Sequence, residues 1–186
     1  MQESKYNIWK IASSKNHNFS FRTYEFYLGS IDNLDFDHID ELIDISTDAI
    51  FLYGTYKTAG FLIQNGVTVY QYILSYEGDF SFGNGYGVNH GDDLLYLWNY
   101  ANIPLTEQDI IVQNIMTTAW ANFAIFGDPT PPGMSDFSWS PLQSVSDFQF
   151  WNISGPNPTM DHSVYLQNRM ELWQQIIGWN KRFYWN

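Results

Sequence analysis

The residue of this sequence best suited to acid–base chemistry is His90. An imidazole changes charge near neutral pH, so a histidine can accept a proton and return it within one reaction. His90 lies in a segment, residues 77–91, whose five glycines give the backbone wide conformational freedom. Asp92 and Asp93 follow it, and Tyr86 precedes it on the same loop. From the residues alone, both a catalytic histidine and an ordinary loop histidine remain open readings.

The other three histidines lack such a setting. His17 and His38 lie in polar surroundings, and His162 follows Asp161, an expected helix N-cap, so we interpret all three as surface residues. No set of His, Asp and Glu has the spacing of a metal site, and the absence of cysteine excludes thiolate zinc sites and disulfides within the chain. We therefore expect no metal and no cofactor.

Two further patterns could indicate ligand binding. The run Gly83-Asn84-Gly85-Tyr86-Gly87 could cradle a phosphate, but no lysine or helix-opening Ser/Thr follows at the spacing of a P-loop. The acidic stretch 32–48 could hold calcium, but it lacks the central glycine and closing glutamate of an EF-hand. Backbone freedom and a solvated helix face explain these two segments better.

The charge of the chain excludes some partners. Eight Lys and Arg against twenty Asp and Glu give a formal charge of -12 and a pI near 4.4. Such a chain repels nucleic-acid phosphates and anionic lipid headgroups, so we expect no nucleic acid partner and no electrostatic membrane binding. No apolar run is long enough to span a bilayer, and the N-terminus does not have the pattern of a signal peptide. Sequons at Asn18 and Asn152 permit N-glycosylation if the protein is secreted.

The elements that must position His90 can be predicted from the sequence pattern. Residues 32–48 have the spacing of an acidic amphipathic helix entered through a turn, and residues 49–64 that of a largely buried helix. Residues 67–76 are β-branched and aromatic throughout, which predicts a strand interior to a sheet. The glycines then predict a long loop over residues 77–91 that carries His90.

The second half of the chain contains one strongly marked helix. Thr106 is a candidate N-cap with Asp109 three residues on, and Gly127 and Pro129 provide the end of the helix. Residues 128–147 should be irregular, and a possible edge strand covers residues 148–153. A last helix is predicted for residues 161–178.

These elements do not make a complete sheet. One interior strand and one edge strand would leave backbone groups unpaired, although the composition is that of a packed core. We therefore expect the chain to be a single partial domain, residues 1–186, whose remaining strands lie on polypeptide outside this sequence.

Several strings in register resemble one family. The string Gly87-Val88-Asn89-His90-Gly91-Asp92-Asp93-Leu94-Leu95-Tyr96-Leu97-Trp98 is similar to the segment around the catalytic histidine of type-B carboxylesterases, which include insect esterases and the cholinesterases. The resemblance extends over about residues 24–175. It also includes Asp48-Ala49-Ile50-Phe51, Val69-Tyr70-Gln71-Tyr72, Trp120 to Pro129 with its ending Gly127-Asp128-Pro129, Trp139-Ser140-Pro141, and Arg169 to Trp173.

The resemblance implies an α/β-hydrolase fold, here its C-terminal portion, and a serine carboxylesterase activity on small carboxylic esters. In such enzymes the triad runs Ser, then Asp or Glu, then His, so His90 corresponds to the catalytic histidine. By position, Asp93 resembles a buried acid with a structural role, while Asp92 and Tyr86 are candidates for the substrate pocket. Ordinary packing or solvation remains an equal reading for all three. The resemblance slightly favours a secreted or extracellular location and implies no oligomeric state.

Two alternatives follow from what these residues lack. They contain neither the nucleophile elbow Gly-x-Ser-x-Gly nor a Gly-Gly oxyanion segment, so His90 alone has no oxygen to activate. The chain could instead be a catalytically silent, neuroligin-like binding relative, or a truncated remnant without enzymatic activity. We favour the fragment of an active serine esterase, which contributes only the histidine.

Overall fold

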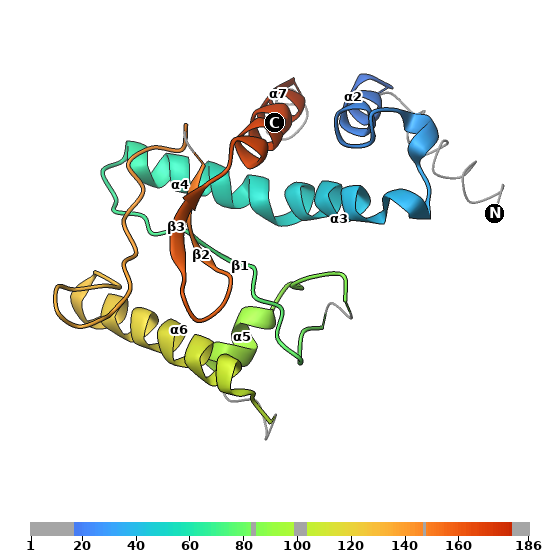
Figure 1. Ribbon diagram of the computed structural model, residues 1–186. Helices are drawn as coiled ribbons and strands as arrows, with labels where there is room; N and C mark the ends of the chain where they lie inside the picture. The colour runs from blue at the N-terminus through green and yellow to red at the C-terminus, as the bar shows by residue number, and fades with distance from the viewer. Residues whose placement is uncertain (1–16, 83–84, 99–103, 147, 180–186) are drawn as a thin grey trace. The chain divides into compact units, whose positions relative to one another are not determined.

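The computed structural model describes residues 17–82, 85–98, 104–146 and 148–179. The backbone divides into two compact units, one of Met1–Thr58 with Tyr165–Asn186 and the other of Ala59–Val164. Figure 1 traces the elements along the chain. His90 and the sheet belong to the second unit.

The first unit is helical. It consists of α2 (His17–Leu28), the short 3-10 turns η1 (Ile31–Asn33) and η2 (Phe36–His38), α3 (Ile39–Thr47), the π-helical turn η3 (Asp48–Leu52), the start of α4 (Tyr53–Gln64) and nearly all of α7 (Val164–Trp179). The helix expected within residues 32–48 begins at Ile39, after the two short turns. Ser30 and Asp35 form these turns, because each accepts a backbone N–H two residues on, at 3.2 and 3.0 Å. The sequence pattern did not reveal α2.

The second unit contains a three-stranded sheet and two helices. Its elements are β1 (Tyr72–Leu74), α5 (Asp92–Leu97), α6 (Glu107–Phe126), β2 (Gln149–Ile153) and β3 (Thr159–His162). The strand order is β1-β2-β3, with β1 parallel and β3 antiparallel to β2. A parallel pair requires a crossover connection, and α5 and α6 lie in the connection between β1 and β2.

The limits of α6 agree with the prediction. The side chain of Thr106 accepts the N–H of Asp109, and the Asp109 carboxylate accepts the N–H of Thr106, which completes a capping box. Gly127 ends the helix with φ 72°, a left-handed conformation that glycine adopts without strain. Among the described residues, no helix combines the length and the apolar composition needed to cross a membrane.

The strands differ from the prediction in length and order. Only Tyr72–Leu74 of the predicted strand 67–76 is regular, although Gln71 accepts the N–H of Trp151 at 2.8 Å. Within the described residues β1 lies at the edge of the sheet and β2 in the middle, the reverse of the expected positions. The last helix begins at Val164 rather than at residue 161, because Thr159–His162 pairs with β2 as an unpredicted strand.

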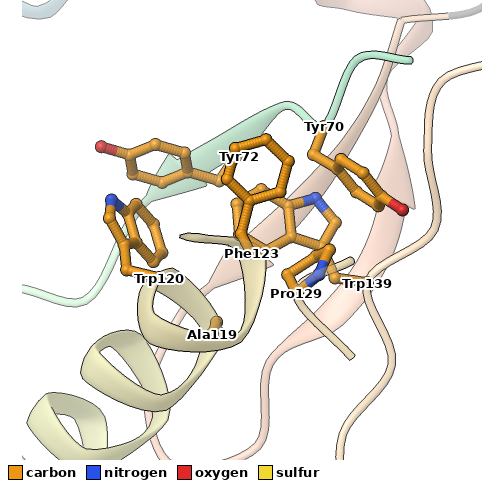
Figure 2. Close-up of a pocket in the computed structure, with 7 residues that line it drawn as sticks. All are labelled: Tyr70, Tyr72, Ala119, Trp120, Phe123, Pro129 and Trp139. Carbon is orange, nitrogen blue, oxygen red and sulfur yellow. The ribbon is translucent and has the colours of Figure 1, made fainter. Parts of the chain in front are cut away.

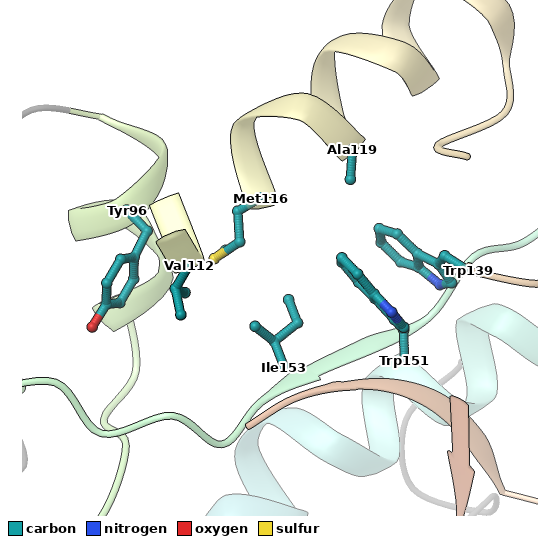
Figure 3. Packing of buried hydrophobic residues seen from close by; sticks show 7 residues of the cluster. All are labelled: Tyr96, Val112, Met116, Ala119, Trp139, Trp151 and Ile153. Atoms are coloured by element: carbon teal, nitrogen blue, oxygen red, sulfur yellow. The ribbon is translucent and has the colours of Figure 1, made fainter. Parts of the chain in front are cut away.

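A buried cluster joins α6 to the central strand (Figure 3). Its members are Tyr96, Val112, Met116, Ala119, Trp139, Trp151 and Ile153. The Trp139 and Trp151 rings stack with centroids 4.6 Å apart, and the indole N–H of Trp139 donates to the Gln71 carbonyl at 3.2 Å. Trp139 lies in the segment predicted to be irregular, so a residue outside any regular element completes this core.

Candidate functional site

His90 lies in a tight turn immediately before α5. Gly91 follows it with φ 92°, a left-handed backbone conformation that favours glycine, and α5 begins at Asp92. The N–H of Asp92 donates to the Asn89 carbonyl at 3.1 Å, and the N–H of His90 donates to the Asn89 side chain at 2.9 Å. The His90 side chain is exposed. The turn therefore holds the backbone of the histidine while its imidazole faces solvent.

Asp92 is buried beneath this turn, with only 2% of its surface exposed. Its carboxylate accepts the Ser81 hydroxyl at 2.6 Å, the Phe82 N–H at 3.1 Å and the Asn89 N–H at 2.8 Å. All three donors come from the segment before His90. Asp92 thus joins the start of α5 to the glycine-rich loop.

Asp93 contacts a different element. It is half-buried and accepts the hydroxyl of Tyr72, on β1, at 2.8 Å. Burial and the hydrogen bond to Asp93 raise the pKa of the Tyr72 hydroxyl well above its usual value, so it remains a neutral donor at physiological pH. The sequence indicated Asp93 as the buried acid after the histidine, whereas Asp92 is the more deeply buried of the two.

The base of the loop is fixed by a second buried carboxylate, that of Asp109. It accepts the hydroxyl of Tyr96 at 3.2 Å and that of Thr106 at 2.7 Å. Burial favours a higher pKa for Asp109, but hydrogen bonds, those from Thr106 foremost, outweigh it and hold the pKa below its usual range. A Cβ on Gly78 would approach the Asp109 oxygen to 2.5 Å. The first loop glycine is therefore required for close packing and Gly91 for its backbone conformation.

A pocket of about 190 Å³ lies between β1, α6 and the segment after α6 (Figure 2). It is lined by Tyr70, Tyr72, Ala119, Trp120, Phe123, Pro129 and Trp139. Neither Tyr86 nor Asp92, the two candidates for a substrate pocket, contributes to it, and Tyr86 is 65% exposed. Tyr72 connects this pocket to the His90 loop through Asp93.

The two sequons lie in different environments. Asn152 is on the central strand β2, and its amide nitrogen, the atom that would carry a glycan, donates to Asp161 at 2.8 Å. Its carbonyl oxygen accepts the hydroxyl of Ser75. This half-buried position disfavours glycosylation at Asn152. Asn18 is on α2, but its side chain lies outside the part of the structure that is described.

The first unit contains a buried ion pair that the sequence did not reveal. Arg169 on α7 donates to both carboxylate oxygens of Asp48 at 2.6 Å, and both side chains are almost completely buried. Both residues belong to strings that resemble the family, but nothing in those strings indicated that they pair. The signal available was the one acid of η3 and the one basic residue of α7.

Aromatic residues complete this ion pair. The Tyr27 hydroxyl donates to Asp48, and the Trp173 indole N–H donates to the Tyr27 oxygen at 2.8 Å. Burial alone would lower the pKa of Arg169, but the hydrogen bonds to Asp48 raise it above its usual value, so the guanidinium stays charged. The network connects α2, η3 and α7 through buried side chains.

At the His90 loop, an exposed imidazole lies two residues from the Asp92 carboxylate that bonds the loop. In the described part of the chain, no three His, Asp or Glu side chains are grouped so that they could hold a metal ion. The nucleophile elbow Gly-x-Ser-x-Gly occurs nowhere in the sequence.

Comparison with known proteins agrees with the resemblance. The model of the carboxylesterase family matches residues 1–173. Juvenile hormone esterase of Tribolium castaneum is 29% identical, over 85% of this chain and 31% of its own length. Esterase cest-33 of Caenorhabditis elegans is 28% identical, over 83% of this chain and 30% of its own. This chain thus spans about a third of the length of these relatives.

A solved structure shares the fold. The crystal structure of juvenile hormone esterase from Manduca sexta, with OTFP covalently attached, matches with a TM-score of 0.63 and 21% identity. The match covers 84% of this chain and 31% of that one. The fold is therefore the α/β-hydrolase fold, of which this chain contains a part, with helices and a small mixed sheet.

Proposed function

The chain belongs to the carboxylesterase family, and from this premise we propose that it supplies the histidine of a serine esterase, with His90 as the general base. His90 would accept the serine proton as the acyl carbon of an ester is attacked and would then return it to the leaving alcohol. The substrate class is small carboxylic esters. The observation that carries the proposal is the exposed imidazole on a turn whose backbone is fixed by Asp92 and Gly91.

The rest of the machinery is assigned to polypeptide outside these 186 residues. A triad requires a nucleophile and an oxyanion hole, and this sequence contains neither of their motifs. The chain corresponds to about a third of its relatives' length, which supports the interpretation of a single partial domain that contributes the histidine only. In isolation it should show no hydrolysis of para-nitrophenyl acetate that a serine-directed organophosphate inhibits.

A chimera tests the role of His90. The matching C-terminal third of Tribolium castaneum juvenile hormone esterase is replaced by this chain, and organophosphate-sensitive hydrolysis of para-nitrophenyl acetate is measured. We expect His90→Gln to lower kcat by at least about 1,000-fold, as removal of a triad histidine does. The control His162→Gln, an exposed residue on β3, should leave kcat within about twofold because it has no part in proton transfer.

Two results would contradict the proposal. One is a folded chimera, with a cooperative melt, that retains its turnover after His90→Gln. The other is organophosphate-sensitive turnover by the 186-residue chain alone, because such turnover requires a serine nucleophile within this sequence.

A further inference from the structure

Asp92 is a buried carboxylate, and its unit offers no lysine or arginine that could pair with it. Residues 59–164 contain neither lysine nor arginine. Burial of a carboxylate is unfavourable unless hydrogen bonds replace the lost water, and here one hydroxyl and two backbone amides do so. The same three hydrogen bonds also hold the loop in place, because the loop residues are their donors.

One of the three bonds holds Asn89, the residue directly before the histidine. The N–H of Asn89 donates to the Asp92 carboxylate at 2.8 Å, while the Asn89 carbonyl accepts the N–H of Asp92 at 3.1 Å. Both backbone polar groups of Asn89 are thus bound to one residue. The Asn89 side chain in turn accepts the N–H of His90 at 2.9 Å. The orientation of the peptide groups that lead into His90 therefore depends on Asp92.

We propose that Asp92 is a positioning residue for His90, which holds the histidine turn in place through the amides of Phe82 and Asn89. The inference rests on the proposed function of His90 and adds the residue that aims it. A displacement of about 1 Å at a reacting group can lower a rate about 100-fold, so a turn that holds the histidine in place should preserve the reaction rate. Asp93, one position on, has a different role because it binds Tyr72 on β1.

The substitution Asp92→Asn tests this arrangement at nearly constant volume. The two carboxylate oxygens each accept a backbone N–H, that of Phe82 at one oxygen and that of Asn89 at the other. A carboxamide offers only one oxygen, so one of these amides must face an NH2 group and lose its acceptor. Ser81→Ala removes the hydroxyl that bonds Asp92 at 2.6 Å and the Gly87 carbonyl at 3.2 Å, leaves both backbone amides their carboxylate oxygens, and serves as the milder variant. Asp93→Asn is the matched control, since it makes the same chemical change without touching residues 81–89.

Hydrogen exchange on the full 186-residue chain measures the loop without any need for activity. In Asp92→Asn, we expect the amides of Phe82 and Asn89 to exchange at least about tenfold faster than in the wild type. Ser81→Ala should accelerate them less, and Asp93→Asn should leave them unchanged. If Asp92→Asn does not fold, exchange in Ser81→Ala decides whether Asp92 anchors the loop. Unchanged exchange in the folded Asp92 or Ser81 variant, or equal acceleration in Asp93→Asn, would overturn the anchoring role.

Kinetics of the chimera then separate positioning from mere stabilisation. Asp92→Asn should lower kcat about 10- to 100-fold and leave KM within about twofold, because the turn moves but the ester pocket does not. Asp93→Asn should change kcat much less. Unchanged kcat in spite of faster exchange would show that the anchor does not aim the histidine. A folded wild-type chimera without turnover would instead overturn the proposed function of His90, and with it the catalytic role of Asp92. The hydrogen-exchange result would still decide whether Asp92 anchors the loop.

Discussion

At the scale of single residues, the sequence indicated which groups matter better than it indicated their partners. The resemblance of the string around His90 to the histidine segment of type-B carboxylesterases pointed to this residue, and the structure places it on an exposed turn. The burial of Asp92 rather than Asp93 could not be predicted, because α5 has only six residues and too little periodicity to assign a buried face. Asp48 and Arg169 lie 121 residues apart, so only the folded chain reveals that they pair.

The ion pair between Asp48 and Arg169 provides a stability prediction. Asp48→Ala removes both hydrogen bonds from the buried guanidinium to Asp48 and leaves Asp44, at 2.8 Å, as its remaining carboxylate partner. It should lower the free energy of unfolding by about 3 kcal/mol, the lower end of the range for a broken buried ion pair. The double variant Asp48→Leu with Arg169→Met removes both charges and should lower it less than Asp48→Ala alone. Urea denaturation followed by circular dichroism measures all three chains.

A surface change is the control for the ion pair. Arg22→Gln alters the exposed hydrogen bond to Gln175 and should change the free energy of unfolding by less than about 1 kcal/mol. If Asp48→Ala were as mild as Arg22→Gln, the buried network would not stabilise the first unit.

At the scale of elements, predictions succeeded where local signals fix both ends. α6 has Thr106 and Asp109 at its start and Gly127 at its end, so its limits follow from residues at its own two ends. Strands depend on partners far along the chain, which explains why the apolar run 67–76 contains only three residues of regular strand. The polar strand Thr159–His162 was mistaken for the start of a helix because Asp161 looked like an N-cap.

The capping box of α6 provides a pH-dependent prediction. Because the folded-state pKa of Asp109 is held below its unfolded value of about 3.9, its contribution to stability is present above pH 4 and is lost as the pH falls through the folded pKa. Thr106→Ala should lower the free energy of unfolding by about 1 kcal/mol at pH 7. Its effect should shrink as the pH falls through the folded pKa, because protonation of Asp109 weakens the cap.

Urea midpoints of Thr106→Ala and the wild type at pH 7, 5 and 3 measure this dependence. Asp109→Asn is the matched variant, and its stability should vary less with pH below 4 because the titrating group is absent. A difference between Thr106→Ala and the wild type that stays constant from pH 7 to pH 3 would contradict the assigned role of the Asp109 carboxylate.

At the scale of the whole molecule, the structure contains apolar surface of the kind that other polypeptide covers. α6 buries Val112, Met116 and Ala119 in the core cluster, and a helix that is apolar on its other sides as well is normally covered. Five large apolar side chains on α6 are nevertheless 43–71% exposed: Ile110, Ile111, Phe123, Ile125 and Phe126. In the described sheet, β1 is also paired on one side only. The count of predicted strands indicated an incomplete sheet, but it could not indicate that the backbone forms two compact units.

The isolated chain is therefore expected to bind a hydrophobic dye and to associate with itself, because apolar side chains and an unpaired strand edge both favour intermolecular contacts. Light scattering after gel filtration and the fluorescence of the dye measure these properties. The double variant Ile111→Glu with Ile125→Glu should reduce both, since it removes two exposed apolar side chains from α6. The control Gln108→Glu with Ala121→Glu adds the same two charges at exposed positions of the same helix and should reduce them much less. A monomer of the unmodified chain that melts in one sharp transition without binding the dye would contradict the partial-domain interpretation, because such behaviour requires a complete core.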